Sequence, residues 1–351
     1  MQKKIINTAI IGFGTSGRYF HAPFLHTHLN FNLKKVVERH ASKSKKIYPY
    51  VDVVADYKDL LKDKSIELIA ICTPNFLHYE QAKACLKAGK HIIIEKPFTV
   101  SSKEADSLIK LSRKYKRNIF VYHNRRWDSD FKTLKRIVDE DILGEIYEFE
   151  AHFDRYRPEL AYERWKEKQM PGSGILYDLG AHLIDQALTL LGKPTGLKAD
   201  IQKQRNNALV DDYFRIELYY PDLKVILTAG MLEENHNLRY ILKGHKGSYK
   251  KTGIDPQEAA LRKGLMPQSE NWGEESKNYW GLMDAVIDKK HCLCTIESLK
   301  GNYMEFFDNV YEVIANDAEI SVKPEQARNV IKIIELAFLS VNTNNRTIKI
   351  T

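Results

Sequence analysis

The first third of the chain alternates short apolar runs with helical segments. The segment 76–88 is closed by Gly89, which suits a left-handed C-terminal cap, and the residues Ser101-Ser102-Lys103-Glu104 form a capping box that opens a further helix. Apolar strands that alternate with helices are typical of a doubly wound, mainly parallel α/β sheet. The predicted strands are 8–11, 33–37, 51–54, 68–72, 91–94 and 119–122.

The hydrophobic pattern changes after Tyr122. Residues 146–154, 214–220 and 225–229 alternate apolar and polar positions with a period of two. Strands with one apolar and one polar face indicate an open, largely antiparallel sheet, whose polar face meets water or a second subunit. The second part of the chain is therefore predicted to be an α+β domain.

The length of 351 residues is sufficient for two domains with separate cores. We expect the first domain to span 1–122 and the second 123–351, with a C-terminal helix over 325–341 that could pack back on the first domain. With 43% hydrophobic and 28% charged residues, the composition is that of an ordinary globular protein. No apolar run is long enough to span a bilayer, so we expect no membrane association.

The net charge of +8 does not indicate a nucleic-acid partner, because the basic residues are dispersed among 46 acidic ones. One local excess, Lys43 with Lys45 and Lys46, reads either as a solvated helix end or as an attraction for a phosphorylated cofactor.

Neither the first residues nor the cysteines suggest an extracellular protein. The start lacks a hydrophobic segment and a cleavage site typical of a signal peptide. Four cysteines show no metal-site spacing or disulfide framework. A reducing cytoplasm is the expected location.

The residues Gly12-Phe13-Gly14-Thr15-Ser16-Gly17 follow the first predicted strand and open a helix, which is the context of a dinucleotide-binding fingerprint. Gly12 permits the tight turn, Gly14 lets the backbone approach a pyrophosphate, and Gly17 lets the helix pack on the strand. The helix N-terminus would hold the phosphates. The alternative is a glycine-rich structural turn.

The end of the second predicted strand, Val37-Glu38-Arg39-His40, bears on the choice between NAD and NADP. A carboxylate there binds the ribose hydroxyls of NAD, whereas an arginine accepts the 2′-phosphate of NADP. Glu38 and Arg39 could instead form a surface pair. We favour NADP, with Arg39 and His40 over the adenine and its phosphate.

The loop Thr73-Pro74-Asn75 follows the fourth predicted strand. It is placed either to cover the nicotinamide side of the cofactor or to form a turn with Asn75 as the helix N-cap. His78, in the helix that follows, is included with this loop among the expected cofactor contacts.

Glu95-Lys96-Pro97 follows the buried apolar run 91–94. A lysine at this strand end points to the crevice in which open α/β sheets bind ligands. Beside the positive nicotinamide, its pKa should be depressed, so that Lys96 transfers a proton or donates a hydrogen bond to the substrate oxygen. The alternative is an interdomain salt bridge.

Asp178 and His182 are four residues apart and share a helix face after the loop Pro171-Gly172-Ser173-Gly174. A carboxylate beside an imidazole fixes its tautomer and raises its basicity, so His182 could take a hydroxyl proton. The alternatives are a surface ion pair or a metal site, but no third ligand has suitable spacing.

Further polar and aromatic residues are candidates for substrate contacts. Asn124 follows the last predicted strand of the first domain and could reach the nicotinamide or the substrate. Arg155, Tyr156 and Trp165 leave a strand in a segment rich in donors and rings, which would suit a polyol. That segment could equally be a subunit-interface loop.

In their order and spacing, the glycine fingerprint, Glu95-Lys96-Pro97 and Asp178-Leu179-Gly180-Ala181-His182 resemble the glucose-fructose oxidoreductase, inositol dehydrogenase and MocA family. The segments 122–130, 153–158 and 253–258 further resemble the branch that contains NADP-dependent scyllo-inositol dehydrogenases. The resemblance covers essentially the whole chain.

This resemblance implies a Rossmann domain followed by an α+β domain whose open sheet makes a dimer interface, with pairing into a dimer of dimers left open. It implies that Lys96, Asp178 and His182 form the catalytic group, with a cis bond before Pro97. The expected reaction moves a hydride between NADP or NAD and a secondary hydroxyl of a cyclic polyol or sugar. A glycosidase that uses the nicotinamide transiently, and a non-catalytic regulator that senses cofactor and sugar, are the alternatives.

Overall fold

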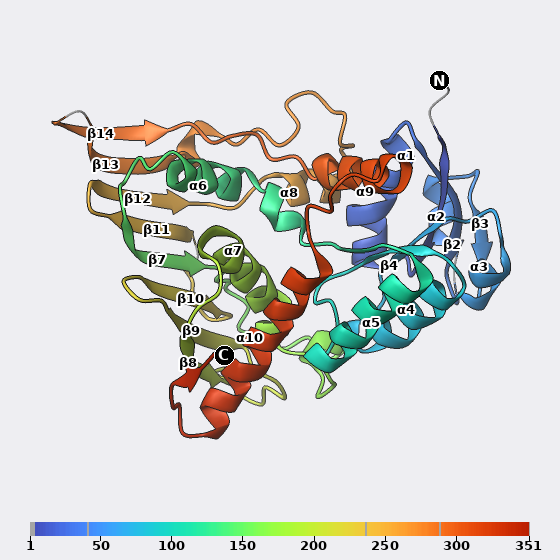
Figure 1. Cartoon of the computed structure of the whole chain (residues 1–351), viewed down its shortest axis with the longest axis horizontal. Coiled ribbons are helices and arrows are strands. Elements are labelled where there is room, and N and C mark those ends of the chain that lie inside the picture. The colour runs from blue at the N-terminus through green and yellow to red at the C-terminus, as the bar shows by residue number, and fades with distance from the viewer. Residues whose placement is uncertain (1–3, 41, 236, 288, 351) are drawn as a thin grey trace. The chain divides into compact units, whose positions relative to one another are not determined.

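The computed structural model describes residues 4–40, 42–235, 237–287 and 289–350, which form two compact units (Figure 1). Each unit is assembled from three segments of the chain. The first consists of Met1–Asn124, Gln257–Trp272 and Asn302–Arg328, and the second of Arg125–Pro256, Gly273–Gly301 and Asn329–Thr351.

The first unit contains a parallel sheet of six strands, within the described residues, in the order β3-β2-β1-β4-β5-β6. The predicted doubly wound sheet is therefore confirmed. The strand order reverses between β1 and β4, and ligands bind beyond the carboxyl ends of the strands at such a switch point. The strands are β1 (Ile6–Ile11), β2 (Phe31–Val37), β3 (Asp52–Val54), β4 (Leu68–Ile71), β5 (His91–Ile94) and β6 (Ile119–Val121).

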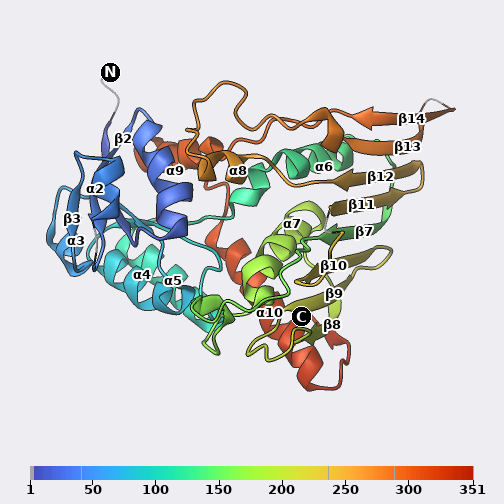
Figure 2. The ribbon, with the colours of Figure 1, turned by 180° about the vertical axis from the view of Figure 1, so that it is seen from behind.

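Helices cover both faces of this sheet. Figures 1 and 2 show α4 and α5 on one side and α1 with α9 on the other. The rings of Phe24 on α1 and Phe307 on α9 are stacked with centroids 5.0 Å apart. The helices are α1 (Ala22–Thr27), α2 (Lys43–Ile47), α3 (Lys58–Lys62), α4 (His78–Lys87), α5 (Ser102–Tyr115), α8 (Gln257–Arg262) and α9 (Met304–Asn316).

The second unit is built on a mixed sheet of nine described strands in the order β14-β13-β12-β11-β7-β10-β9-β8-β15. Only the β7–β10 pair is parallel among these described strands, so the largely antiparallel sheet is also confirmed. The strands are β7 (Ile146–His152), β8 (Gly196–Gln202), β9 (Tyr213–Tyr219), β10 (Lys224–Gly230), β11 (Leu238–Gly244), β12 (Gly247–Thr252), β13 (Gly281–Ile287), β14 (Lys290–Ile296) and β15 (Ile348–Lys349).

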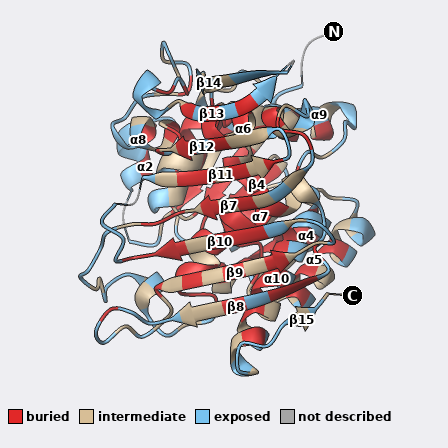
Figure 3. Ribbon diagram, turned by 90° about the vertical axis from the view of Figure 1, so that its left-hand side faces the viewer, coloured by how far each residue is buried: buried red, intermediate tan, exposed pale blue. Residues whose placement is uncertain are grey.

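One face of this sheet is covered and the other is open. The alternating residues Phe214, Ile216 and Leu218 of β9 are fully buried. Figure 3 looks onto the open face, with α6 and α7 behind the strands. The remaining helical elements are α6 (Ser129–Asp139), α7 (Ala181–Leu191), α10 (Pro324–Asn342), short 3₁₀ turns at Asn75–Leu77, Asn124–Trp127, Trp165–Glu167 and Lys277–Tyr279, and π-helical turns at Gly17–His21 and Leu176–Gly180.

Helix α10 begins in the first unit and continues in the second. Its first turns are tied to α5, where Arg328 donates to Asp106 at 2.9 Å and Glu325 accepts from Arg113 at 2.7 Å. None of the helices in the described segments has the length and apolar character needed to cross a membrane.

Candidate functional site

The glycine-rich turn of the first unit has the geometry that a bound dinucleotide requires. Gly12 has a φ of +93°, and a Cβ at Gly17 would lie 2.1 Å from the carbonyl oxygen of Gly12. A Cβ at Gly14 would meet no atom within 4 Å, so the backbone there is open to close approach. The residues therefore fit a pyrophosphate at the start of the following helix.

The helix after this turn starts as a π-helical turn, Gly17–His21, and its side chains meet Glu95. Glu95 is buried and accepts hydrogen bonds from the Ser16 hydroxyl and, at 2.8 Å, from His21 Nε2. Burial by itself would raise the pKa of Glu95, but these two bonds and the charge of Lys96 hold the pKa below its ordinary value. An ionised Glu95 thus joins the glycine turn to the end of β5.

Lys96 lies directly after this carboxylate and is half-buried. Its backbone N–H donates to Glu95 Oε2 at 3.1 Å, and the Lys96–Pro97 peptide bond is cis, as the resemblance implied. The strand end therefore fixes the backbone from which the lysine side chain projects.

His78 connects the two loops that flank β4 and β5. It is buried, with Nδ1 3.0 Å from the carbonyl oxygen of Pro97 and Nε2 3.0 Å from that of Thr73. Burial lowers its pKa. His78 therefore holds the Thr73-Pro74-Asn75 loop against the lysine turn, which is a positioning role rather than a contact offered to solvent.

The polar residues after β2 differ in their hydrogen bonding and exposure. The Glu38 carboxylate accepts hydrogen bonds from the backbone of Lys43 at 3.0 Å and from the backbone and hydroxyl of Ser44 at 2.8 and 2.5 Å. Arg39 and His40 are exposed. The acid therefore stabilises the start of α2, while cationic and aromatic side chains remain accessible at the strand end.

In the second unit, Asp178 lies on the π-helical turn Leu176–Gly180 and His182 on the first turn of α7. Asp178 is half-buried, and His182 is buried beside the ring of Phe153, with centroids 6.3 Å apart. Single π-helical turns are frequent at functional sites, and both such turns among the described residues coincide with segments singled out from the sequence.

Buried polar groups hold helix α7 on the face that carries His182. Asp185, one turn after His182, accepts two hydrogen bonds from the guanidinium of Arg126, at 2.9 and 2.6 Å. Gln186 accepts from Arg239 at 3.3 Å and donates to the carbonyl of Arg125 at 3.0 Å. These bonds orient the helix face that carries the imidazole.

The predicted substrate residues lie on the segment that leaves β7. The guanidinium of Arg155 lies over Phe153, 5.3 Å from the centroid of the ring that also flanks His182. Tyr156 is half-exposed, and Trp165 opens the short 3₁₀ turn Trp165–Glu167. Asn124 is buried at the end of the first unit. The structure thus groups Arg155 with His182 through one ring.

Lys166 was not among the site residues predicted from the sequence. Its ammonium lies 2.6 Å from Asp178 Oδ1, and Gly174 N donates to the Lys166 carbonyl at 3.0 Å. No local signal marks this lysine, because the contact joins two segments twelve residues apart through an irregular loop.

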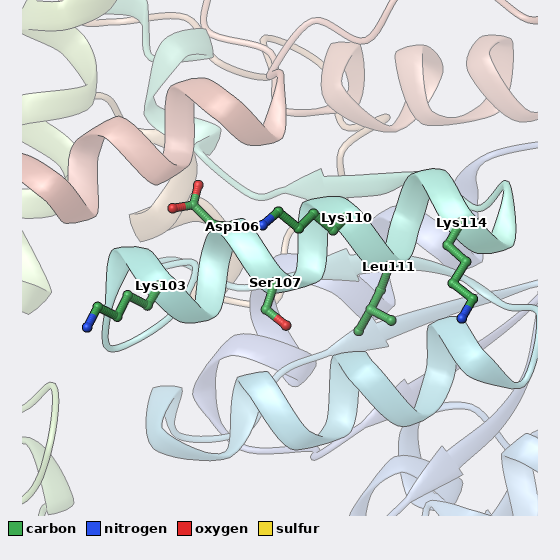
Figure 4. A pocket seen from close by; sticks show the side chains of 6 residues that line it. All are labelled: Lys103, Asp106, Ser107, Lys110, Leu111 and Lys114. Carbon is green, nitrogen blue, oxygen red and sulfur yellow. The ribbon is translucent and has the colours of Figure 1, made fainter.

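The described residues offer no metal cluster as an alternative site, and the hollow on α5 contains none of the candidate residues. No group of three or more potential metal-ligating side chains is found among the described residues. Figure 4 shows the hollow, whose Asp106 is paired with Arg328. It is lined by Lys103, Asp106, Ser107, Lys110, Leu111 and Lys114, none of them a candidate residue.

Comparison with known proteins identifies the family. A family model described as "Oxidoreductase family, NAD-binding Rossmann fold" matches residues 6–123, and its companion, "Oxidoreductase family, C-terminal alpha/beta domain", matches 135–350. The chain belongs to the Gfo/Idh/MocA family. The resemblance drawn from the three motifs is thereby confirmed, and the protein is an oxidoreductase with a Rossmann domain for a nicotinamide dinucleotide.

Members of the family match the chain over nearly its full length. It is 37% identical over 343 residues to scyllo-inositol 2-dehydrogenase (NADP(+)) IolW of Bacillus subtilis, covering 98% of this chain and 95% of that protein. It is 41% identical to the Escherichia coli protein named uncharacterized oxidoreductase YdgJ, with 95% and 96% covered. A crystal structure of an oxidoreductase from Bacillus cereus superposes with a TM-score of 0.91 at 33% identity, covering 99% of both chains.

Proposed function

We propose that the protein is an NADP-dependent dehydrogenase that oxidises a secondary hydroxyl of a cyclic polyol of the inositol type, or reduces the matching ketone. The observation that carries the proposal is the full-length similarity to a scyllo-inositol 2-dehydrogenase that uses NADP. Support comes from the fit of the glycine turn to a pyrophosphate, and from the acid on the turn Leu176–Gly180 and the imidazole on the adjoining first turn of α7.

The residues that hold the cofactor belong to the first unit. Gly12, Gly14 and Gly17 shape the turn for the pyrophosphate, and Arg39 with His40 receives the adenosine end. The nicotinamide, when bound, supplies the hydride acceptor or donor. The loop Thr73-Pro74-Asn75, held by His78, and Glu95 complete the cofactor contacts in this proposal.

Three residues are proposed to act on the reacting hydroxyl, and one of them transfers its proton. His182 is the acid/base, because its buried imidazole on α7 can take the hydroxyl proton. Asp178 accepts a hydrogen bond from the substrate. Lys96 donates a hydrogen bond to the oxygen under reaction, which polarises it. Asn124, Arg155, Tyr156 and Trp165 are proposed to contact the polyol.

The preference for NADP rests on the residues after β2. Glu38 is hydrogen-bonded to Lys43 and Ser44, whereas Arg39 is exposed and can pair with a 2′-phosphate. Arg39→Ala should therefore weaken NADPH binding about tenfold and leave NADH binding nearly unchanged. The measurement is a fluorescence titration with each nucleotide, with Lys58→Ala, an exposed cation on α3, as the control. Tighter binding of NADH than of NADPH by the unaltered protein would contradict the proposal.

The catalytic roles are tested by separating turnover from cofactor binding. Lys96→Met and His182→Ala should each lower kcat by about 100-fold or more with a cyclic polyol, since general acid–base catalysis contributes about 10²–10⁴-fold. Both variants should bind NADPH nearly as the unaltered protein does. Normal turnover in either variant would remove that residue from the mechanism.

We further propose that the protein acts as a homodimer, or a dimer of dimers, in the cytoplasm. The open sheet face carries the exposed apolar side chains Leu282, Val286 and Leu293, which supports a subunit interface there. The free thiols Cys72 and Cys85 fit a reducing compartment.

A further inference from the structure

Asp178, proposed above to accept a hydrogen bond from the substrate, forms an ion pair with Lys166, a residue to which the proposed function gives no role. Lys166 Nζ lies 2.6 Å from Asp178 Oδ1. The lysine side chain is 45% exposed and the aspartate side chain 18%, so the pair is open to a ligand on the lysine side. Ordinary surface pairs contribute little to stability, so the position of this one suggests another role.

The loop that carries Lys166 is held by a buried clamp. The Arg205 side chain is only 3% exposed and donates to Asp212 at 2.9 Å. Its guanidinium also lies 3.5 Å from Glu167, the neighbour of Lys166, and Glu167 accepts from the backbone of Ala161 at 2.9 Å. Two further bonds, at 3.2 and 3.1 Å, run from Arg205 to the carbonyl oxygens of Arg157 and Glu159.

This clamp gives the loop a fixed shape before any ligand arrives. The Lys166 carbonyl accepts from Gly174 N at 3.0 Å, which ties the lysine backbone to a position two residues before the turn that carries Asp178. The backbone that carries Lys166 is therefore held by hydrogen bonds from Gly174 and through the neighbouring Glu167.

An ammonium and a carboxylate side by side are complementary to two neighbouring hydroxyl groups. The carboxylate accepts hydrogen bonds only, and the ammonium donates three. One hydroxyl of a vicinal diol can donate to Asp178 while the adjacent oxygen accepts from Lys166.

We propose that Lys166 and Asp178 form a receptor for a vicinal diol, so that the substrate carries a hydroxyl on the carbon next to the one oxidised. This inference rests on the proposed dehydrogenase function and names the feature of the substrate that the site selects. Lys166 binds and orients, and it takes no proton in the reaction.

The test compares a cyclic polyol that the unaltered protein oxidises with the analogue that lacks the neighbouring hydroxyl. The unaltered protein should show a kcat/KM about 10- to 100-fold higher for the diol, as expected for a hydrogen bond to a charged group. Lys166→Met should lose this preference, mainly through a higher KM for the diol. Lys166→Arg should restore most of it, and Lys168→Met, an exposed lysine on the same loop, should behave as the unaltered protein.

The outcomes separate this inference from the proposed function. If Lys166→Met keeps the full preference for the diol, or loses activity equally with both compounds, the proposed diol receptor is wrong. The proposed dehydrogenase function is not affected by that result. If the unaltered protein oxidises no polyol, the proposed function fails. Calorimetric titration of scyllo-inositol into the NADPH-bound protein then still tests the receptor, which predicts binding by the unaltered protein and about 10- to 100-fold weaker binding by Lys166→Met. Equal binding of scyllo-inositol by the two proteins, or no binding by the unaltered protein, would overturn the proposed receptor.

Discussion

Asp211, in the segment before β9, contacts the start of the helical turn that carries Asp178. Its carboxylate accepts from the backbone of Leu176 at 2.8 Å, and a Cβ at Gly174, whose φ is +92°, would lie 2.0 Å from Asp211 Oδ1. Burial, together with the charge of neighbouring Asp212, raises the pKa of Asp211 to about 6. A glycine is therefore required at position 174, and the carboxyl group behind it titrates well above the usual range.

This titration predicts a pH dependence of stability. The folded protein binds the Asp211 proton more tightly than the unfolded chain does, so the contribution of this group is favourable below about pH 4 and is lost as the pH rises through about 6. The loss is at most about 3 kcal/mol, since one pKa unit corresponds to about 1.4 kcal/mol. Urea unfolding across this range should show a flatter pH profile for Asp211→Asn than for the unaltered protein. If Asp211→Asn had the same pH profile of stability as the unaltered protein, the role given to Asp211 would be contradicted. Asp222→Asn, at an exposed position, serves as the control and should keep the profile of the unaltered protein.

Residues with a local backbone requirement could be predicted from the sequence. Gly12 and Gly17 were expected to make the tight turn and the close packing, and the positive φ and the 2.1 Å approach agree. Lys166 and Arg205 were not found. Their partners lie in other loops, and neither residue type nor spacing predicts which loops meet in space.

Helix α5 shows how far a short motif specifies an element. The Ser101 hydroxyl accepts from the backbone of Glu104 at 3.3 Å, and the Glu104 carboxylate accepts from the backbone of Ser101 at 3.2 Å. The capping box predicted from the sequence is confirmed. Such a cap satisfies backbone donors that the first turn of a helix leaves unpaired.

Removing this cap should lower stability by a measurable amount. Ser101→Ala is expected to reduce the free energy of unfolding by about 1 kcal/mol, with little effect on kcat, since α5 begins beyond the lysine turn. Ser101→Asp keeps an oxygen acceptor and should retain most of the stability. Urea unfolding of the two variants and the unaltered protein checks this prediction. Equal unfolding midpoints for Ser101→Ala and the unaltered protein would show that the capping box contributes nothing to stability.

The strands were predictable because burial imposes a period of two or a continuous apolar run on them. The alternation over 214–220 agrees with the burial of Phe214, Ile216 and Leu218. The segment 155–174 has no such period, since its shape depends on hydrogen bonds from Arg205, in a distant loop, to the carbonyl oxygens of Arg157 and Glu159. The π-helical turns have no sequence signature of their own and were expected as ordinary helix.

At the scale of the whole molecule, each of the two units draws on separate parts of the chain. The first unit includes 257–272 and 302–328, and its core stacks Phe24 on Phe307. Hydrophobic periodicity predicts elements but not which later elements join an earlier sheet, so this assembly is known only from the structure. The cofactor residues lie in the first unit, and Asp178 with His182 lies in the second.

The most direct test of the central claim is the initial rate of nicotinamide reduction with NADP and with NAD across a panel of inositols and aldoses. The account predicts turnover with at least one cyclic polyol, a clear preference for NADP, and loss of that rate in His182→Ala. No turnover across the panel, despite tight NADPH binding, would contradict the dehydrogenase and favour a glycosidase with a transient redox step or a cofactor-sensing regulator.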